Sequence, residues 1–319
     1  MKIAVTGSGV VSPAGWGVAP FLAAFETGEP LPVEFRARPG REDAPSRVRA
    51  VPKPETKLPF LRDPRMRRTS PVGRFAVGAA LEALGEARAQ SVRDGALRLG
   101  VVTTLFCGCV NYSQRFYREV LDDPHTASPI IFPETVFNAP SSHLSAMLGS
   151  HSVNYTMIGD TAEFLCGLEI AAAWLLNREV DACLVVCGEE FDWLTAEAME
   201  LFQPGCVMGE GAAALCLELA HEPEVGLLQI AGPELITARQ PRREAARRVH
   251  EAVVGGERLD CLEPQRCREI FGQGLGAAAG WECVAAVERA RRLAKPVVVE
   301  VAGVNEHCAA AVFGGFQDD

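Results

Sequence analysis

The sequence predicts an α/β fold in which helices cover both faces of a mostly parallel sheet. Residues 97–106 and 182–187 are unbroken apolar runs, which are typical of strands buried on both faces. Between them, residues 162–176 carry apolar side chains at helical spacing. Helices that alternate with such strands need a sheet with both faces covered. Each half of the chain ends in a predicted strand pair, which suggests an internal duplication.

The first half, residues 1–220, opens with a strand over 2–6, and the glycines and prolines that follow indicate a loop. Residues 29–66 hold eight of the 21 prolines and little periodicity, so we interpret them as a surface excursion. The other predicted elements are helices over 20–26, 74–88, 139–148 and 162–176, strands over 97–106 and 182–187, and an antiparallel pair over 212–218 and 225–230.

The second half, residues 221–319, has fewer elements. We predict helices over 242–253 and 276–292 and strands over 297–301 and 309–313, the strands being joined by a tight turn around Gly303–Asn305. No low-complexity linker separates the halves, so we expect them to share one core.

Composition excludes several classes of protein. With 48% hydrophobic residues the chain can bury a large core, and its net charge of −10 disfavours nucleic-acid binding, which needs a basic surface. No apolar run approaches the roughly 18 residues of a membrane span, and the first residues form a strand pattern rather than a signal peptide. We therefore expect a cytoplasmic protein without a membrane segment.

Neither the cysteines nor the first glycines indicate a cofactor. Most of the eleven cysteines lie in apolar runs, and Cys107 and Cys109 lack the second pair or histidines of a zinc set. In Thr6–Pro13 the third glycine of a dinucleotide-binding loop is replaced by Ser12, and the proline that follows disturbs the helix start. We expect no metal and no cofactor.

The segment VMGEGAAALCLE (Val207–Glu218) is more specific. Gly209, Glu210 and Gly211 precede a buried strand, so we expect a tight turn whose carboxylate binds backbone N–H groups. As a string it resembles the G-E-G-A-x-A-L-x-L-E signature of β-ketoacyl synthases, which have the thiolase fold. Six other segments resemble this family in the right order: Thr6–Pro13, Arg67–Ser70, Phe132–Gly149, Glu179–Glu190, Gly272–Gly280 and Gly303–Phe313.

This resemblance implies two similar halves with mixed sheets in a layered αβαβα arrangement, the second half being shortened. It also implies a specific chemistry. A ketosynthase carries the acyl chain on a cysteine at the N-terminus of a buried helix, where the dipole lowers the thiol pKa. Two histidines stabilise the enolate oxygen that forms when a malonyl unit loses its carboxylate.

The nucleophile of this pattern is missing. Counting back from Asp181 and forward from Gly149 both place it at Thr161, in GDTAEF. A hydroxyl without an adjacent base cannot replace a thiolate. We interpret Asp160 and Thr161 as part of an ordinary helix N-cap.

Both histidines are missing as well. The first should lie in residues 258–265, which contain none, and the second is matched by Gln273. The family's lysine is matched by Arg268.

Other residues offer no replacement. Cys166 lies further along the same helix, and we interpret it as a core residue. His143 and His151 are expected to be structural. His307, in the closing turn, is placed to contribute a hydrogen bond, but one histidine without a nucleophile is not a mechanism.

Some type II polyketide and polyene systems pair an active ketosynthase with a homologue that lacks the cysteine, the chain-length factor. The resemblance implies such a subunit, of the aryl-polyene kind. Its partners would be an active β-ketoacyl synthase, in a heterodimer, and an acyl carrier protein. Candidate side chains for the substrate tunnel are Phe106, Phe137, Phe164 and His307.

Carrier domains are acidic, so a cluster of arginines is a candidate docking surface for them, the alternative being a solvated face. These arginines are Arg62, Arg65, Arg67 and Arg68. Two other functions stay open: a divergent active synthase, acyltransferase or thioester hydrolase that uses Thr161, and a purely structural assembly subunit.

Overall fold

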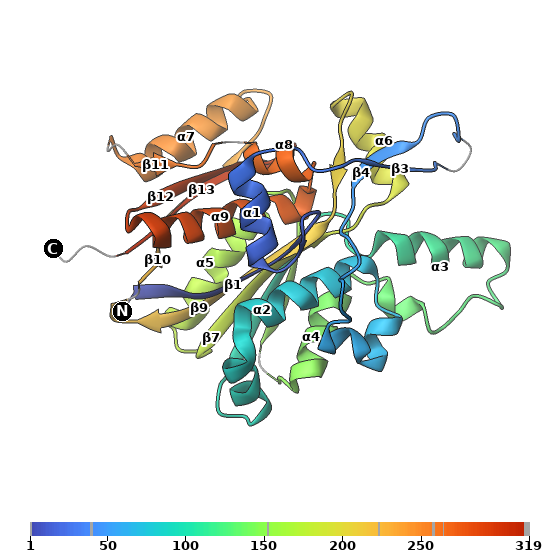
Figure 1. The fold of residues 1–319 in the computed structure, drawn as a ribbon, viewed down its shortest axis with the longest axis horizontal. Coiled ribbons are helices and arrows are strands. Elements are labelled where there is room, and N and C mark those ends of the chain that lie inside the picture. Colours follow the sequence, from blue (N-terminus) through green and yellow to red (C-terminus); the bar gives the residue numbers. More distant parts are fainter. Residues whose placement is uncertain are drawn as a thin grey trace.

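The computed structural model describes residues 2–38, 41–151, 153–222, 224–256, 259–263 and 265–315. One continuous sheet crosses the molecule (Figure 1). The first half supplies β6 (Asn154–Ile158), β5 (Leu99–Leu105), β7 (Ala182–Glu189), β9 (Gly211–Ala220) and β1 (Lys2–Ser12), in this order. The second half continues from β1 with β10 (Gly226–Leu235), β13 (His307–Gly314), β12 (Val297–Ala302) and β11 (Asp260–Cys261), and β2 (Gly15–Trp16) pairs with β1.

The helices are arranged in layers around this sheet. They are α1 (Val18–Thr27), α2 (Pro71–Arg93), α3 (Val110–Asp122), α4 (Ala139–Leu148), α5 (Glu163–Leu176), α6 (Trp193–Phe202), α7 (Arg242–Val254), α8 (Arg266–Phe271) and α9 (Ala278–Leu293). Helix α2 covers the outer face of the first half, and α7 covers that of the second. Helices α5 and α9 lie between, in a core to which strands of both halves contribute. Because α5 and α9 lie between the two halves of the sheet, each half forms a layer of its own. The resulting order of layers (helix, sheet half, helix, sheet half, helix) confirms the predicted thiolase-like αβαβα fold.

The directions of the strands differ from the first expectation. Only β5 with its two neighbours and β11 with β12 are parallel among the described strands of this sheet, so the sheet is mixed rather than mostly parallel. The predicted hairpin of β9 and β10 is also wrong. Ala4 of β1 lies between them, pairing with Glu218 on one side and with Gly226 on the other. A strand buried on both faces is apolar whichever way its neighbours run, so the pattern did not reveal direction.

Gly7 and Gly9, which the sequence placed in a loop, belong to β1. A Cβ on Gly7 would lie 1.9 Å from the carbonyl oxygen of Ala83, and one on Gly9 would lie 2.0 Å from that of Ala79. Both oxygens belong to α2, so these glycines let the helix backbone rest directly on the strand. Glycine is required at these positions for close packing of strand and helix. The sequence pattern alone does not distinguish such glycines from those of a turn.

Three segments contain structure that the sequence did not indicate. The region 29–66 includes β3 (Glu34–Arg36) and β4 (Ser46–Arg49), and β4 pairs with β8 (Met208–Gly209). Helix α3 buries none of its side chains and extends away from the body in Figure 1. The side chains of edge strand β6 are exposed or half-buried. The short strands carry no strong apolar pattern, whereas α3 has Phe116 and Val120 at helical spacing and could have been predicted.

None of the helices in the described part of the chain has the length and apolar character needed to cross a bilayer.

We predict that Gly9→Ala lowers the free energy of unfolding by about 1–3 kcal/mol or more, because the added methyl group collides with the backbone of α2. Chemical denaturation monitored by circular dichroism measures the change. An unchanged midpoint would contradict the close contact between β1 and α2.

Candidate functional site

Three residues that the sequence matched to the family site line one pocket. Thr161, from the loop before α5, Arg268, from α8, and Gln273, from the loop after α8, share a pocket of about 470 Å³. Arg242 and Arg243 extend into the same pocket from α7. The fold therefore brings together positions that lie about a hundred residues apart in the chain.

The N-terminus of α5 differs from the expectation. The helix begins at Glu163, and its N-cap residue is Ala162, with no side-chain hydrogen bond to the first turn. The interpretation of Asp160 and Thr161 as an ordinary N-cap is therefore wrong. Thr161 lies two residues before the helix, and Glu163 occupies the first helical position, where the dipole acts most strongly on a side chain.

Asp160 instead holds the turn between β12 and β13. Its buried carboxylate accepts hydrogen bonds from the backbone N–H groups of Val304 at 2.6 Å, Asn305 at 2.9 Å and Glu306 at 2.8 Å, and from that of Thr161 at 2.7 Å. Burial by itself raises the pKa of Asp160, but these four donors outweigh it and leave the pKa below its ordinary value. Sequence reasoning missed this role, because the donors lie more than 140 residues further along the chain.

His307 faces the first turn of α5. Its Nε2 atom lies 3.6 Å from a carboxylate oxygen of Glu163 and 3.9 Å from Sγ of Cys166. Burial, together with the negative charges of Glu163 and Glu169, raises the pKa of the Cys166 thiol to about 12. At neutral pH this thiol is protonated, so it is not an activated nucleophile.

Arginine and glutamate side chains line the rest of the pocket together with alanine and valine. Arg268 donates hydrogen bonds to the side chains of Gln203 and Gln265. Burial raises the pKa of Glu282 to about 8, although Arg268 opposes the shift. Gln273 donates its backbone N–H to Val207 at 2.8 Å and is itself buried. The described residues that line the pocket include no histidine and no cysteine.

The Thr161 hydroxyl has no hydrogen-bond partner among the described residues, and the neighbouring Asp160 carboxylate is occupied by its four backbone donors. A nucleophilic hydroxyl needs a base in hydrogen-bond contact. The pocket can hold a polar or anionic molecule, but its walls do not present a nucleophile paired with a base.

The Gly–Glu–Gly turn joins three segments. The buried carboxylate of Glu210 accepts hydrogen bonds from the backbone N–H groups of Val51 and Phe191, both at 3.1 Å. Gly211 has a φ of 151°, and a Cβ there would lie 2.2 Å from the carbonyl oxygen of Val11, so no larger residue fits. Gly209 is similarly close to the backbone of Phe271.

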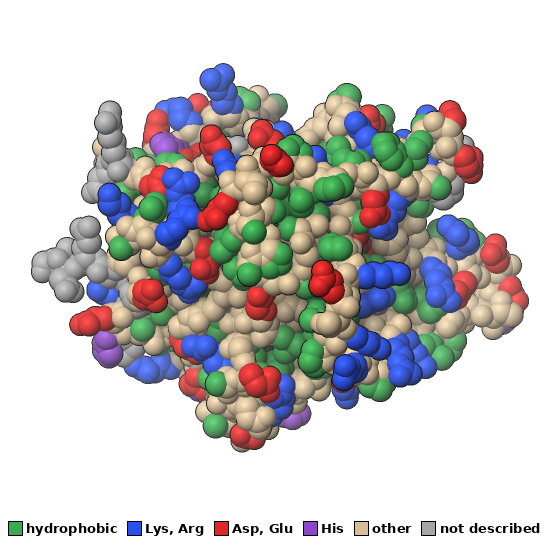
Figure 2. Space-filling model, viewed as in Figure 1, with side chains coloured by type: hydrophobic (Ala, Val, Ile, Leu, Met, Phe, Trp, Pro, Cys, Tyr) green, Lys and Arg blue, Asp and Glu red, His purple; other side chains and the backbone are tan. Residues whose placement is uncertain are grey.

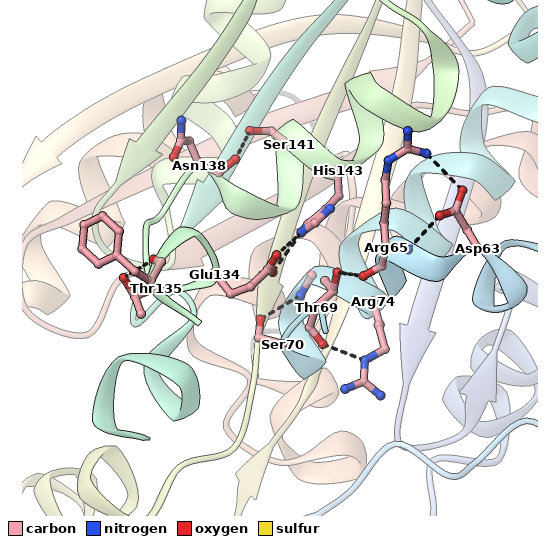
Figure 3. A network of polar contacts seen from close by, with 12 residues as sticks. Asp63, Arg65, Thr69, Ser70, Arg74, Glu134, Thr135, Asn138, Ser141 and His143 are labelled. Carbon is pink, nitrogen blue, oxygen red and sulfur yellow. Dashed lines mark hydrogen bonds and ion pairs between the residues drawn. The ribbon is translucent and has the colours of Figure 1, made fainter. Parts of the chain in front are cut away.

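Two of the histidines lie apart from this pocket. His143 of α4 contacts both carboxylate oxygens of Glu134 at 2.8 and 2.9 Å (Figure 3). The pair lies beside the segment leading into α2, where Arg74 binds the carbonyl of Thr69. This contact gives His143 a structural role, and His151 is exposed after α4.

The three phenylalanines considered for a tunnel are dispersed. Phe164 is fully buried in the core between the sheet halves. Phe106 is partly buried against a smaller cluster that includes Leu275, and Phe137 is 37% exposed and covers Gly108. None of them lines the pocket of Thr161.

A comparison with models of protein families agrees with the resemblance seen in the sequence motifs. A model of the "Beta-ketoacyl synthase, N-terminal domain" matches residues 1–222. The match spans more than half of the chain, and the chain belongs to the β-ketoacyl synthase family. A comparison with curated proteins finds no match.

Solved structures share the whole fold. The ishigamide ketosynthase/chain length factor superposes with a TM-score of 0.80 at 19% identity, covering 99% of this chain and 100% of the other. The ketosynthase ApeO in complex with its chain length factor ApeC, from Xenorhabdus doucetiae, gives 0.75 at 13%, covering 99% and 98%. A type II polyketide ketosynthase in complex with its acyl-carrier protein, AntDE:AntF, gives 0.76 at 15%, covering 99% of each. At sequence identities this low, the superpositions show a shared fold and nothing more.

We predict that Asp160→Asn lowers the free energy of unfolding by about 2 kcal/mol at pH 7, because charged hydrogen bonds to buried donors are lost. The pKa of Asp160 is lowered by folding, so its stabilisation is fully present above the unfolded value of about 4 and is lost as the pH falls below it. The difference from wild type, followed by urea denaturation at several pH values, should therefore shrink in acid.

Asp181→Asn is the matched control. The pKa of Asp181 is also lowered, mainly by its hydrogen bond to Arg98, but this ion pair is exposed. An effect below about 1 kcal/mol is expected there. Equal effects of the two substitutions would contradict a special role for Asp160.

Proposed function

We propose that this chain is a non-catalytic, chain-length-factor-like subunit that pairs with an active ketosynthase in polyketide or polyene chain elongation on acyl carrier protein. The observation that carries the proposal is the site itself. Where the family resemblance calls for a thiolate and two histidines, the chain has Glu163 at the helix start, Thr161 without a base, and Gln273. The nearby Cys166 has a pKa of about 12, so it does not supply the missing nucleophile.

An exposed sheet edge supports the heterodimer. Strand β6 pairs with β5 on one side, and its other side faces no described strand. Tyr155 is 51% exposed and Ile158 is 56% exposed on this strand, and Val153 just before it is 40% exposed. An open edge with apolar side chains is a ready surface for another chain. We assign this edge to the ketosynthase partner.

The comparisons supply the kind of partner. Two of the similar structures are ketosynthases with chain length factors, and a third is a ketosynthase with its acyl-carrier protein. By analogy we propose an active ketosynthase and an acyl carrier protein as partners here, and a polyene of the aryl type as a candidate product.

A basic surface supports contact with the carrier protein. The side chains of Arg62, Arg67 and Arg68 make no hydrogen bond or ion pair with the described residues, while Arg65 pairs with Asp63 at 3.3 Å. Figure 2 shows Lys and Arg side chains gathered at the lower right of the view, over the segment that leads into α2. Unpaired arginines on an otherwise acidic protein favour an acidic partner.

We predict that the purified chain, incubated alone with acyl- and malonyl-loaded carrier protein, forms no acyl-enzyme and no elongated product by intact-mass spectrometry. With a ketosynthase encoded beside it, the mixture should elongate. Acylation of the chain alone that disappears in Thr161→Ala would establish the alternative of an active enzyme.

Product length distinguishes a chain-length factor from a purely structural subunit. In the co-expressed complex, Phe106→Ala and Phe137→Ala should shift the product distribution towards longer chains, because a smaller side chain leaves more room in the proposed tunnel. Phe164→Ala serves as the control, because this residue is buried in the core and its loss should lower stability without shifting length. A product distribution that neither Phe106→Ala nor Phe137→Ala alters would favour the purely structural subunit.

We predict that Ile158→Arg weakens the heterodimer at least tenfold, or about 1.4 kcal/mol, because a charge replaces an apolar contact at the proposed edge. Leu201→Arg is the control, since Leu201 is 81% exposed but lies on α6, outside this edge. The dissociation constant of each variant is measured by its binding to surface-immobilised ketosynthase. A complex that tolerates Ile158→Arg would place the interface elsewhere.

A further inference from the structure

Glu163, Cys166 and His307 form a compact cluster that the proposed function does not use. Glu163 and Cys166 are three positions apart on α5 and so lie on one face of the helix, and His307 is the first residue of β13. One ligand atom from each residue lies within 4.8 Å of the others. His307 is only 5% exposed, so the cluster is largely shielded from solvent.

The distances in the cluster suit a shared ion better than direct contacts. The same ring nitrogen, Nε2 of His307, faces both other residues, at 3.6 Å from the Glu163 oxygen and 3.9 Å from the Cys166 sulfur. The first distance is too long for a hydrogen bond. Tetrahedral zinc, with bonds of about 2.0–2.3 Å to nitrogen, oxygen and sulfur, separates its ligand atoms by about 3.4–3.6 Å. A small contraction would bring all three atoms to one ion.

The surrounding charges favour a cation. The one ion pair that Glu163 makes within the described residues is with His307. The negative charges of Asp160 and Glu306 act on Glu163, and that of Glu169 acts on Cys166. No lysine or arginine of the described part forms a salt bridge with any of these acidic groups. The carboxylate of Glu163, the imidazole of His307 and the thiol of Cys166, which contact one another and no basic side chain among the described residues, provide a mixed ligand set of the kind that zinc prefers.

We propose that Glu163, Cys166 and His307 bind one Zn²⁺ ion, which fastens the first turn of α5 to the start of β13. The metal displaces the thiol proton of Cys166, as zinc does in binding cysteine. Three protein ligands leave a fourth position for water. This proposal does not depend on the partner or the activity of the chain.

A second cluster of the same residue types provides a matched control. His250, Cys261 and Glu300 also place their ligand atoms within 4.8 Å. Here the His250 side chain is 40% exposed, Cys261 is exposed, and Nδ1 of His250 is already paired with Glu300 at 2.5 Å. Burial and the negative charges of Glu300 and Asp260 raise the pKa of the Cys261 thiol, but here a cation, Arg289, opposes the shift. We expect this cluster to bind no zinc.

The test uses the full-length chain, purified without chelator and with any affinity tag removed. Elemental analysis should find one zinc per chain, and replacement by Co²⁺ should give a sulfur-to-cobalt charge-transfer band. Cys166→Ala and His307→Gln should each weaken zinc binding by about 100-fold or more. Loss of a residue that only hydrogen-bonds to a metal ligand typically weakens binding by about 10–100-fold. Circular dichroism establishes that each variant is folded, and Cys166→Ala alters only a half-buried side chain.

The control variants are His250→Gln and Cys261→Ala, which should retain the full zinc content and the cobalt band. Added Zn²⁺ should also raise the Tm of the metal-free wild type but not that of Cys166→Ala. A wild-type chain that holds no zinc after supplementation would overturn the proposal. Zinc that survives in Cys166→Ala and is lost in Cys261→Ala would overturn it as well, by assigning the metal to the second cluster.

Discussion

The burial of α5 between the two halves of the sheet determines what the chain can place at the N-terminus of this helix. Both halves contribute strands to the core that encloses α5 and α9, so the helix cannot shift without opening both. The loop before the helix must therefore satisfy contacts from the second half. Asp160 does this by accepting three backbone N–H groups of the turn between β12 and β13. A buried carboxylate with its donors removed would be left uncompensated, which makes this contact costly to lose.

The layers of the fold could be predicted from the sequence, whereas the pairing of strands could not. Apolar runs and helical periodicity located the buried elements, and α4 lies at the predicted residues 139–148. The direction of a strand leaves no trace in an apolar run, so β1 between β9 and β10 was not foreseen. Gly7 and Gly9 indicated a turn because close approach of a helix and a turn both require glycine. The edge strand β6 had no buried face to reveal it, whereas α3 has Phe116 and Val120 at helical spacing and was overlooked.

The site was predictable in its members but not in its details. Counting along the family pattern selected Thr161, Arg268 and Gln273, and these residues line one pocket. Helix α5 starts at Glu163, one residue after the predicted start at 162, because helix boundaries are the least certain part of a sequence-based expectation. The contacts of Asp160 and His307 join segments more than 140 residues apart. Their spacing along the chain holds no local motif, and only the fold brings them together.

Glu163 places a carboxylate at the start of α5, where the family resemblance implies a thiolate. A helix N-terminus favours a negative charge, whether it is a thiolate or a carboxylate. A thiolate there is reactive, whereas a carboxylate is a weak nucleophile and a good partner for a cation. Burial raises the pKa of Glu163, and His307 opposes that shift. A bound cation would stabilise the ionised carboxylate further. A carboxylate at the start of α5 therefore favours binding of a cation over nucleophilic attack, as the proposed function and the proposed zinc site both require.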